Sequence, residues 1–481
     1  MRAQAFIRTI SFLCISFSAM LLPPLLVSLW RQDGQAGHFA LIAAVVLAVG
    51  SLLWWPFRRH PLQLHNRDGY LIVATFWLLL GALGAIPFLW TLHLSFGAAL
   101  FESVSGLTTT GATVLTGLDR LPPSLLFYRQ EIQWFGGMGL VVLAVAILPL
   151  LGTGGMSVYR AEAPGPMKEE KLTPRLGSTA RVLWIVYVGF TVACALAYWW
   201  AGMTPFDAIS HSLSTLSTGG FSTHDASLGY YHSIRVELVA IVFMLVGGVN
   251  FSIHYLALHQ RDPLVYLRDV EVRTFLLFVA GVILFIAGNL WLLQTYPHWT
   301  RTLRNSAFEV VSIITSTGFG TADFSTWPLF LPVLLIFISF IGGCGGSTAG
   351  GIKVMRMLAL AKMGRRELRR LYHPRASFPI KIGGRAVPEK TLQAIWGFFS
   401  VYIGAFVLLM LAMMWAGLDQ VSAFSAIATC MNNLGPGLGR VTANFAGVSD
   451  SAKLIGVLAM LAGRLEVFTV MVLLHPAYWR D

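Results

Sequence analysis

The stretch SGLTTTGAT, residues 105–113, lies between two segments that are apolar enough for a lipid bilayer. Its centre is three threonines followed by Gly111, and such residues are unfavourable inside a helix. The flanking segments, residues 71–90 and 127–150, each reach the roughly 20 residues that a helix needs to cross a bilayer core. The stretch therefore predicts non-helical backbone at membrane depth, which is tolerated only when it is buried in protein or lines a water-filled cavity.

The composition of the whole chain indicates a helical membrane protein with many spans. Of its 481 residues, 56% are hydrophobic and 12% are charged, and the mean hydropathy is +0.68. The apolar share lies well above that of an ordinary soluble domain, and the charged share lies well below it. The first apolar run, residues 6–29, is long for the core of a signal peptide, so we expect it to be a retained helix.

The net charge of +12 comes from lysines and arginines that gather in a few loops. Such a charge on a soluble protein would suggest nucleic acid, but basic loops in a membrane protein mark its cytoplasmic side, so we expect no nucleic-acid partner. The richest basic segment covers residues 353–390, and smaller groups lie at 58–67, 160–181 and 261–273. The four cysteines are widely spaced and predict neither a disulfide framework nor a zinc site.

Three further stretches repeat the pattern of residues 105–113. They read TLSTGGF at 215–221, TSTGFG at 315–320 and MNNLGPG at 431–437. If Gly111, Gly219, Gly318 and Gly435 are equivalent, the period is roughly 100 residues, which is longer than a common solenoid repeat and fits a unit of two membrane helices. A phenylalanine lies 10 to 13 residues before each glycine and opens an amphipathic stretch too short to span the membrane. Each stretch is therefore predicted to be a re-entrant half-helix with an extended return strand.

Two apolar segments flank each of these stretches. The first segments cover residues 71–90, 182–201, 275–293 and 395–416, and the second segments cover 127–150, 234–258, 329–341 with a broken continuation, and 454–474. Together with two helices near 6–29 and 39–55, they predict ten crossings, which would put both termini in the cytoplasm with the basic loops.

The predicted fold is an all-α polytopic membrane protein. Four channel-like repeats, each a helix, a re-entrant pore loop and a second helix, surround a pseudo-fourfold pore, and two extra transmembrane helices precede them. The expected domains are an N-terminal helical hairpin (1–66), repeat 1 (67–152), repeat 2 (177–260), repeat 3 with a broken second helix and a basic cytoplasmic extension (270–372), and repeat 4 (386–481).

The extended strands have the chemistry of a filter for a dehydrated monovalent cation. Rings of backbone carbonyls replace the water around K⁺, hydroxyls of threonine and serine add uncharged ligands, and glycine permits the backbone angles that aim carbonyls inward. For a single copy, close packing of helices is the stronger alternative, but four copies in the same setting favour the filter. The candidate K⁺ filter residues are Thr109, Thr110, Gly111, Ser217, Thr218, Gly219, Ser316, Thr317, Gly318, Asn433, Leu434 and Gly435.

A glycine-rich loop interrupts the second helix of the third repeat, and we expect it to be an intramembrane gate beneath the filter. A phosphate-binding loop is disfavoured because Gly351 is followed by Ile352 rather than by the Lys-Ser/Thr pair of that motif. Close helix packing is the other alternative. The candidate gate residues of the loop are Gly342, Gly343, Gly345, Gly346, Ser347, Thr348, Gly350, Gly351 and Lys353.

Charged residues add two further candidates. Arg464 lies within the last apolar span, where an arginine costs ~2.5–3.5 kcal/mol on insertion scales, so it is expected to face protein or water. Two roles are considered for Arg464: a gate residue, or one partner of a structural ion pair with a nearby acid. The outer-mouth candidates Asp119, Asp225 and Asp323 follow their glycines by 8, 6 and 5 residues and would raise the local cation concentration, unless they are ordinary loop acids.

With these residues the chain resembles the Trk/Ktr/HKT superfamily of K⁺ uptake proteins, specifically the TrkH-type subunit of bacteria, over nearly its whole length. The resemblance rests on the four strands, on GGCGGSTAGGIK at 342–353 and on GRLE at 463–466. It implies one central glycine per strand, looser selectivity than in two-glycine channel filters, a gating role for the loop, and an arginine at 464 whose charge opposes cations until it is displaced. The fourth strand departs most, because Asn433 and Leu434 replace a threonine or serine pair and Pro436 has no N–H.

The predicted function is K⁺ uptake across the bacterial inner membrane, without covalent chemistry or an organic cofactor. The membrane potential would drive it with ~2.3 kcal/mol per charge per 100 mV, and proton coupling (symport) stays open. The resemblance implies a homodimer gated by a cytoplasmic nucleotide-binding subunit of TrkA type. The basic segment 353–390 is a candidate docking surface for that partner or for anionic membrane lipids.

Two other classes of function are open to test. A secondary or Na⁺-coupled carrier that works by alternating access would predict inverted repeats rather than four parallel ones. A membrane enzyme or sensor would need acids, histidines or cysteines at catalytic spacing, and the sequence contains no such cluster.

Overall fold

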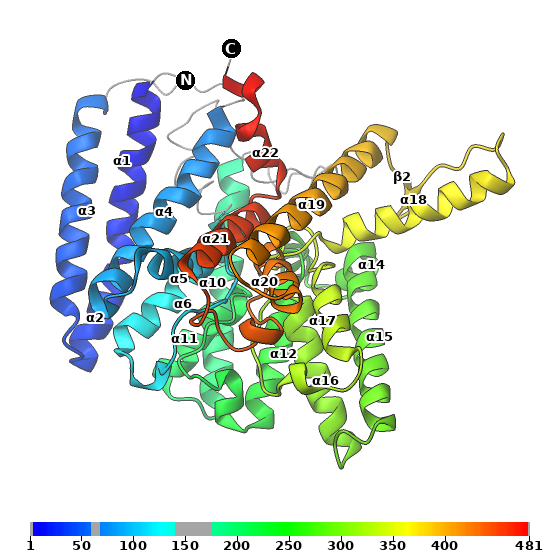
Figure 1. Ribbon diagram of the computed structural model, residues 1–481, viewed down its shortest axis with the longest axis horizontal. Coiled ribbons are helices and arrows are strands. Elements are labelled where there is room, and N and C mark those ends of the chain that lie inside the picture. Colours follow the sequence, from blue (N-terminus) through cyan, green and yellow to red (C-terminus); the bar gives the residue numbers. More distant parts are fainter. Residues whose placement is uncertain (1–2, 59–67, 140–175, 480–481) are drawn as a thin grey trace.

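The computed structural model describes residues 3–58, 68–139 and 176–479, which are mostly helical (Figure 1). In these ranges six helices are long and apolar enough to cross a membrane, and two bent pairs bring the number to eight. A two-stranded antiparallel hairpin, β1 (Lys381–Ile382) with β2 (Arg385–Ala386), is the sheet structure of the described part. The prediction of an all-α polytopic membrane protein is confirmed.

The N-terminal helices stand side by side at one edge of the molecule (Figure 1). α1 (Ala3–Met20) and α2 (Leu22–Arg31) form one membrane span, and α3 (Ala36–Phe57) returns beside it. Close packing explains a glycine here, since a Cβ at Gly50 would lie 2.9 Å from the Cβ of Cys14. The start of α1 and the last described helix, η6 (Pro476–Trp479), lie at the same end of the molecule (Figure 1).

Each of the four repeats contains a long first helix, a short pore helix and a second helix. The first helices are α4 (Asp68–Leu92), α10 (Leu176–Trp200), α15 (Val270–Leu292) and α19 (Glu389–Trp415). The pore helices are α5 (Phe96–Leu107), α11 (Pro205–Leu216), α16 (Trp299–Ile314) and α20 (Gln420–Asn432). The second helices are α6 (Pro123–Gly137), α12 (Ile234–Gly248), α17 (Leu331–Ser339) and α21 (Asp450–Arg464).

Short elements complete the repeats. After each strand the chain turns through a 3-10 helix: η1 (Leu118–Arg120), η3 (Ser227–Tyr231), η4 (Phe324–Thr326) and η5 (Gly439–Val441). The remaining helices are α13 (Phe251–Gln260), α14 (Val265–Arg268), α18 (Val354–Tyr372), α22 (Phe468–Leu474) and η6 (Pro476–Trp479). α18 projects from the bundle beside the start of α19 (Figure 1).

The second helices end abruptly instead of continuing as straight spans. α6, α12 and α21 each have 15 residues. α12 bends by 100° into α13 and α21 by 111° into α22, so the apolar segments 234–258 and 454–474 are each broken rather than continuous helices. The rest of the span expected over 127–150 lies outside the described residues from 140 onward, as do the basic residues at 59–67 and 160–175. The count of ten crossings therefore stays a prediction.

Glycines near these helix ends allow the second helices to touch the pore helices. An ideal Cβ at Gly136 would lie 1.8 Å from the carbonyl oxygen of Leu107. One at Gly463 would lie 2.1 Å from that of Met431, and one at Gly247 would lie 2.8 Å from the Cγ2 of Thr218. Because only glycine fits such approaches, these three positions set how deeply the second helices pack against the centre.

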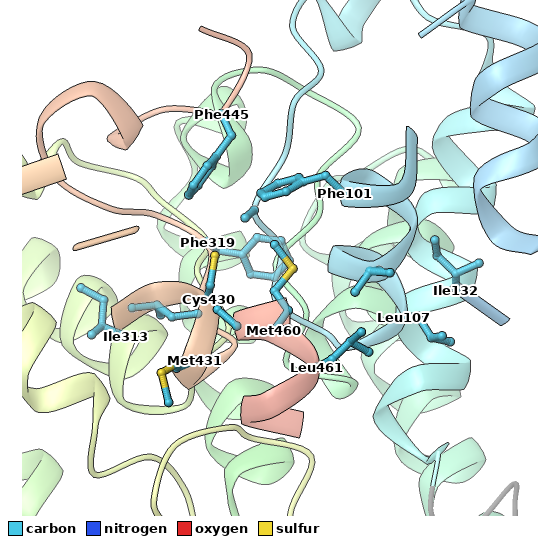
Figure 2. Packing of buried hydrophobic residues seen from close by; sticks show 14 of the residues in the cluster. Phe101, Leu107, Ile132, Ile313, Phe319, Cys430, Met431, Phe445, Met460 and Leu461 are labelled. Carbon is cyan, nitrogen blue, oxygen red and sulfur yellow. The ribbon is translucent and has the colours of Figure 1, made fainter. Parts of the chain in front are cut away.

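Apolar side chains from several repeats pack around the pore helices (Figure 2). The rings of Phe101 and Phe445 are in contact, with centroids 4.9 Å apart and planes tilted by 38°, and Cys430 and Met460 are buried in the same cluster. The lipid-facing surface is apolar as well, and a tryptophan near the end of each first helix is exposed: Trp90, Trp200, Trp291 and Trp415. Tryptophan is enriched at membrane–water interfaces, so we expect these tryptophans to lie where the first helices leave the bilayer.

Candidate filter and gate

The strands that follow the pore helices share one backbone pattern. A left-handed residue is followed two positions later by a left-handed glycine, and the residue between them is outside the left-handed region. The pairs are Thr109 with Gly111, Thr218 with Gly220, Ser316 with Gly318, and Asn433 with Gly435. In each strand the N–H of the middle residue donates to the carbonyl five residues earlier, at 2.8–2.9 Å. These equivalent bonds fix the register between the repeats.

This register corrects the sequence-based alignment of the second repeat. Gly220, with φ +76°, is the equivalent of Gly111, with φ +77°, whereas Gly219 takes the middle position held elsewhere by a side-chain-bearing residue. The motif TGG offers two glycines, and its residue types alone do not decide between them. By the same register Ser210 and Ser425 correspond to Phe101, so Phe206 and Phe424 do not.

The four strands are neighbours in a closed ring. An ideal Cβ at each left-handed glycine would collide with the carbonyl oxygen of the middle residue in the next strand. The distances are 2.2 Å from Gly111 to Gly219, 1.9 Å from Gly220 to Thr317, 2.1 Å from Gly318 to Leu434, and 2.8 Å from Gly435 to Thr110. Because the fourth strand closes on the first, the backbone surrounds one axis, as the predicted pseudo-fourfold arrangement requires.

The side chains of the candidate filter residues make contacts within the protein. The hydroxyls of Thr110 and Thr317 lie 2.7 Å from those of Thr108 and Thr315. The hydroxyl of Ser217 donates to the carbonyl of Leu213 at 2.8 Å. These bonds turn the three hydroxyls toward the pore-helix ends, so at Thr110, Thr317 and Ser217 the backbone oxygens, rather than the side chains, are left to face the ring. The hydroxyl of Ser316 is buried without a hydrogen-bond partner.

The fourth strand contacts the first through its asparagine. The amide of Asn433 donates to the hydroxyl of Thr110 at 2.9 Å and to the carbonyl of Met460 at 3.2 Å. Leu434 is fully buried and supplies the carbonyl beside Gly318. The departure from a threonine or serine pair therefore preserves the backbone pattern.

Buried polar side chains that the sequence analysis missed hold the return strands in place. Glu102 accepts from the N–H of Val114 at 2.9 Å and from the Nε of Arg129 at 2.8 Å. In the third repeat, Glu309 accepts from the N–H of Thr321 at 2.9 Å. The available signal was a charged residue inside an otherwise apolar segment, which must be paired with other polar groups.

The glycine-rich loop lies against the ends of two pore helices. The hydroxyl of Thr348 lies 3.0 Å from the carbonyl oxygen of Leu216, at the end of α11, and 3.2 Å from the hydroxyl of Thr218. A Cβ at Gly350 would lie 2.0 Å from the carbonyl oxygen of Asn432, at the end of α20. The loop thus contacts the beginnings of the second and fourth strands at once.

Hydrogen bonds hold the middle of the loop and the residues just after it. Glu271, in the first turn of α15, accepts from the N–H of Gly345 at 2.8 Å and from that of Met355 at 3.2 Å. Lys353 donates its Nζ to the carbonyl of Ala349 within the loop. Left-handed backbone at Gly342, Gly346 and Gly351 allows the loop to fold into this space.

Arg464 lies between the first strand, the loop and the end of α6. Its Nη1 lies 3.3 Å from the carbonyl oxygen of Thr348 and 3.4 Å from the hydroxyl of Thr109, and its Nη2 donates to the carbonyl of Gly136. Glu466, on the following turn, pairs with Arg356 of α18. The charge of Arg464 therefore lies next to Thr109, at the start of the first strand of the ring.

The structure brings together two of the three outer-mouth acids. His224 donates its Nδ1 to Asp119, and the N–H of Gly117 donates to Asp225 at 3.0 Å. Burial would lower the pKa of His224, but the charge of Asp207, 3.8 Å from its Nε2, and the hydrogen bond to Asp119 outweigh it and hold that pKa above its ordinary value. Asp323 is separate from this cluster and caps η4, accepting from the N–H of Ser325 at 3.0 Å.

Known proteins resemble this chain from end to end. A family model described as "TrkH: Cation transport protein" matches residues 37–480. The "Trk system potassium uptake protein TrkH" of Vibrio parahaemolyticus is 51% identical and that of Escherichia coli K12 is 50% identical, each over 100% of both chains. The crystal structure of "the Potassium Transporter TrkH from Vibrio parahaemolyticus" matches with a TM-score of 0.91 and 48% identity over 100% of both chains. The chain belongs to the TrkH family of cation transport proteins.

Proposed function

We propose that this chain takes up K⁺ across the bacterial inner membrane and that the ring of strands is its selectivity filter. The observation that carries the proposal is the closed succession of glycine-to-carbonyl contacts through all four strands. Relatives named as potassium uptake proteins match the chain over its full length, which supports K⁺ as the transported ion. As a member of a transporter family, the chain is not an enzyme.

The alternating backbone explains how the strands can bind an ion. In an ordinary strand successive carbonyls point to opposite sides, but alternation between left-handed and other conformations turns successive carbonyls toward the same side. Carbonyl oxygens then replace the water around K⁺, while the absence of a fixed charge keeps binding weak enough for release. A polar path that protein encloses within the bilayer is also the setting in which irregular backbone is tolerated.

The gate in this proposal is the loop 342–351 together with Arg464. The loop closes the ring from the side of the pore-helix ends through Thr348 and Gly350, and Arg464 adds a positive charge at the first strand. A K⁺ that leaves the filter must pass this charge, and two unit charges about 4 Å apart repel by about 4 kcal/mol at an effective dielectric constant of about 20. Opening therefore requires the loop and the guanidinium to move apart.

The helix that follows the loop is connected to it directly and can transmit such a movement. α18 begins at Val354, directly after Lys353, so displacement of α18 pulls on the end of the loop. Its sequence is strongly basic, which favours a cytoplasmic position for α18 and for both termini. We propose that the chain forms a homodimer and that a nucleotide-binding subunit of TrkA type, or anionic lipid, acts on this basic segment.

The proposal is tested by expressing the chain in a bacterial strain without its own K⁺ uptake systems. Growth at low K⁺ and saturable influx of radioactive Rb⁺, both dependent on the chain, are expected. A chain that accumulates in the membrane but supports neither growth nor Rb⁺ influx, with or without a co-expressed TrkA-type subunit, would contradict it. Excess organic solutes should leave Rb⁺ influx unchanged, whereas a carrier for such a solute would show competition.

A further inference from the structure

A buried glutamine of the first repeat contacts the filter strand of the second repeat. Gln133, on α6, is fully buried and makes its side-chain hydrogen bonds across the boundary between the two repeats. Its Nε2 donates to the carbonyl of Gly219 at 2.6 Å, and its Oε1 accepts from the hydroxyl of Ser214 at 2.6 Å and from the N–H of Phe221 at 3.1 Å. One amide thus connects the pore helix, the strand and the return segment.

The same amide explains why the second strand has an extra glycine. Gly219 is not in the left-handed region, so its backbone would accept a side chain. An ideal Cβ there would lie 2.4 Å from the Cδ of Gln133 and 2.8 Å from its Nε2. The equivalent positions in the other strands hold Thr110, Thr317 and Leu434. A glycine is therefore needed at position 219 because Gln133 occupies the space that a Cβ would fill. At position 220 a glycine is needed for a different reason, namely the left-handed backbone and the close contact with the backbone of the next strand.

This contact is specific to one boundary of the ring. α6, α12 and α21 are the same length, and their glycines at 136, 247 and 463 align, so the positions that correspond to Gln133 are Met244 and Met460. Both methionines are buried, and Met460 packs in the apolar cluster of Figure 2. Among the described residues, hydrogen-bond donors to the carbonyls of Thr110, Thr317 and Leu434 are not found.

We propose that Gln133 is a positioning residue that sets ion selectivity through the carbonyl of Gly219; this rests on the proposed filter. A carbonyl has two lone pairs, so the oxygen that accepts from Gln133 can still face an ion. The bond holds that oxygen at a fixed distance from the axis and reduces its freedom to move inward. Since Na⁺ is smaller than K⁺ and needs closer ligands, a held carbonyl favours K⁺.

The first test removes the donor and keeps the volume. Gln133→Met is expected to lower the preference for K⁺ over Na⁺ at least threefold, measured as the ratio of concentrations that half-inhibit Rb⁺ influx, with a normal amount of protein in the membrane. A packing role alone would change the amount of protein and leave this ratio unchanged. A ratio within the error of the wild-type value would overturn the inference. If Gln133→Met does not accumulate, Gly219→Ala decides by the same criterion.

The second test uses the two glycines as matched controls. Gly219→Ala should displace the amide and reproduce the altered ratio, and the double variant Gly219→Ala with Gln133→Ala should be no worse than Gln133→Ala alone. Gly220→Ala should abolish selective uptake whether or not Gln133 is truncated, because its Cβ would meet the carbonyl of Thr317 at 1.9 Å. Multiplicative effects of Gly219→Ala and Gln133→Ala would overturn the inference, whereas normal selective uptake in Gly220→Ala would instead overturn the filter.

Discussion

The guanidinium of Arg464 and the carbonyl oxygen of Thr348 lie 3.3 Å apart, joining the last repeat to the glycine-rich loop of the third. The same guanidinium contacts Gly136 at the end of α6 and the first strand at Thr109. A charge at membrane depth must be surrounded by polar groups, and here backbone oxygens of the first and third repeats supply them. The arginine is therefore both a mechanical link between repeats and a charge beside the proposed ion path.

Replacing this arginine should open the inner side of the pore. We expect Arg464→Gln to increase the initial rate of Rb⁺ influx several-fold, because the repulsion is removed and the loop loses a contact. Arg440→Gln is the matched control, since Arg440 is exposed and donates to carbonyls of the outer loops at Gly417 and Gly447. Equal influx in wild type and Arg464→Gln, at equal protein amounts, would argue against a gating charge.

The ion pair behind the first strand should be important for stability. Arg129 and Glu102 are 1% and 0% exposed, and Glu102 also accepts from Thr113 directly after the strand. Arg129→Met leaves a buried carboxylate without its cation, which costs about 3–5 kcal/mol of unfolding free energy. Chemical denaturation of the purified protein measures this loss. The double variant Arg129→Met with Glu102→Gln should recover a substantial part of it, and no recovery would show that the pair does not act as a unit.

The glycine contact between α6 and α5 gives a prediction about packing. Gly136→Ala would place a methyl group on the carbonyl of Leu107, and we expect a loss of about 1–3 kcal/mol from the strain of overpacking. Gly281→Ala in α15 is the control, because no atom lies within 4 Å of its Cβ and alanine favours the helix by up to about 1 kcal/mol. Thermal unfolding in detergent should separate the two variants in opposite directions, and equal effects would contradict the contact.

The outer cluster predicts a pH dependence of stability. Asp119 and Asp207 hold the pKa of His224 above its unfolded value, and the rings of Tyr230, Tyr231 and His211 lie against its imidazole. A raised pKa in the folded state stabilises the protein fully below the unfolded pKa of about 6.5, and this stabilisation is lost as the pH rises through the folded value. The wild type should therefore exceed His224→Gln in melting temperature at pH 6 by more than it does at pH 9.

The control for this prediction is His259→Gln. His259 is an exposed histidine of α13 for which, in the described part of the chain, no ion pair with an acid is found. Its replacement therefore controls for the loss of an imidazole without the loss of an acid partner. A difference between wild type and His224→Gln that is the same at both pH values would mean that the charge of His224 does not link the outer loops.

The main features of the fold could be predicted from the sequence because residues that are unfavourable in a bilayer interrupt its apolar segments. Threonine and glycine at 108–111, ten residues of glycine-rich loop from 342, and Arg464 all carry a cost in a bilayer that needs a structural reason. Recurrence of the first pattern through the chain then indicated four similar units. The structure places the loop and Arg464 at the beginnings of the strands.

Other features depend on which way a side chain faces, which one sequence does not specify. The equivalence of Gly220 with Gly111 follows from backbone angles, and it could not be read from the motif TGG, in which either glycine fits the pattern. Glu102 and Gln133 sit in segments that read as helical, and nothing in their spacing identified the strand that each one holds. The bends at the ends of α12 and α21 were also missed, because the apolar sequence continues through them.

The most direct test of the central claim is the ion preference of Gly318→Ser. Gly318 has φ +80°, and its Cβ would lie 2.1 Å from the carbonyl oxygen of Leu434, so a serine there must displace the backbone of the ring. Competition of K⁺ and Na⁺ against Rb⁺ influx should show a marked loss of preference for K⁺ relative to wild type and to Gly288→Ser, whose Cβ meets no atom within 4 Å. Unchanged uptake and unchanged preference in Gly318→Ser would contradict a filter built from these four strands.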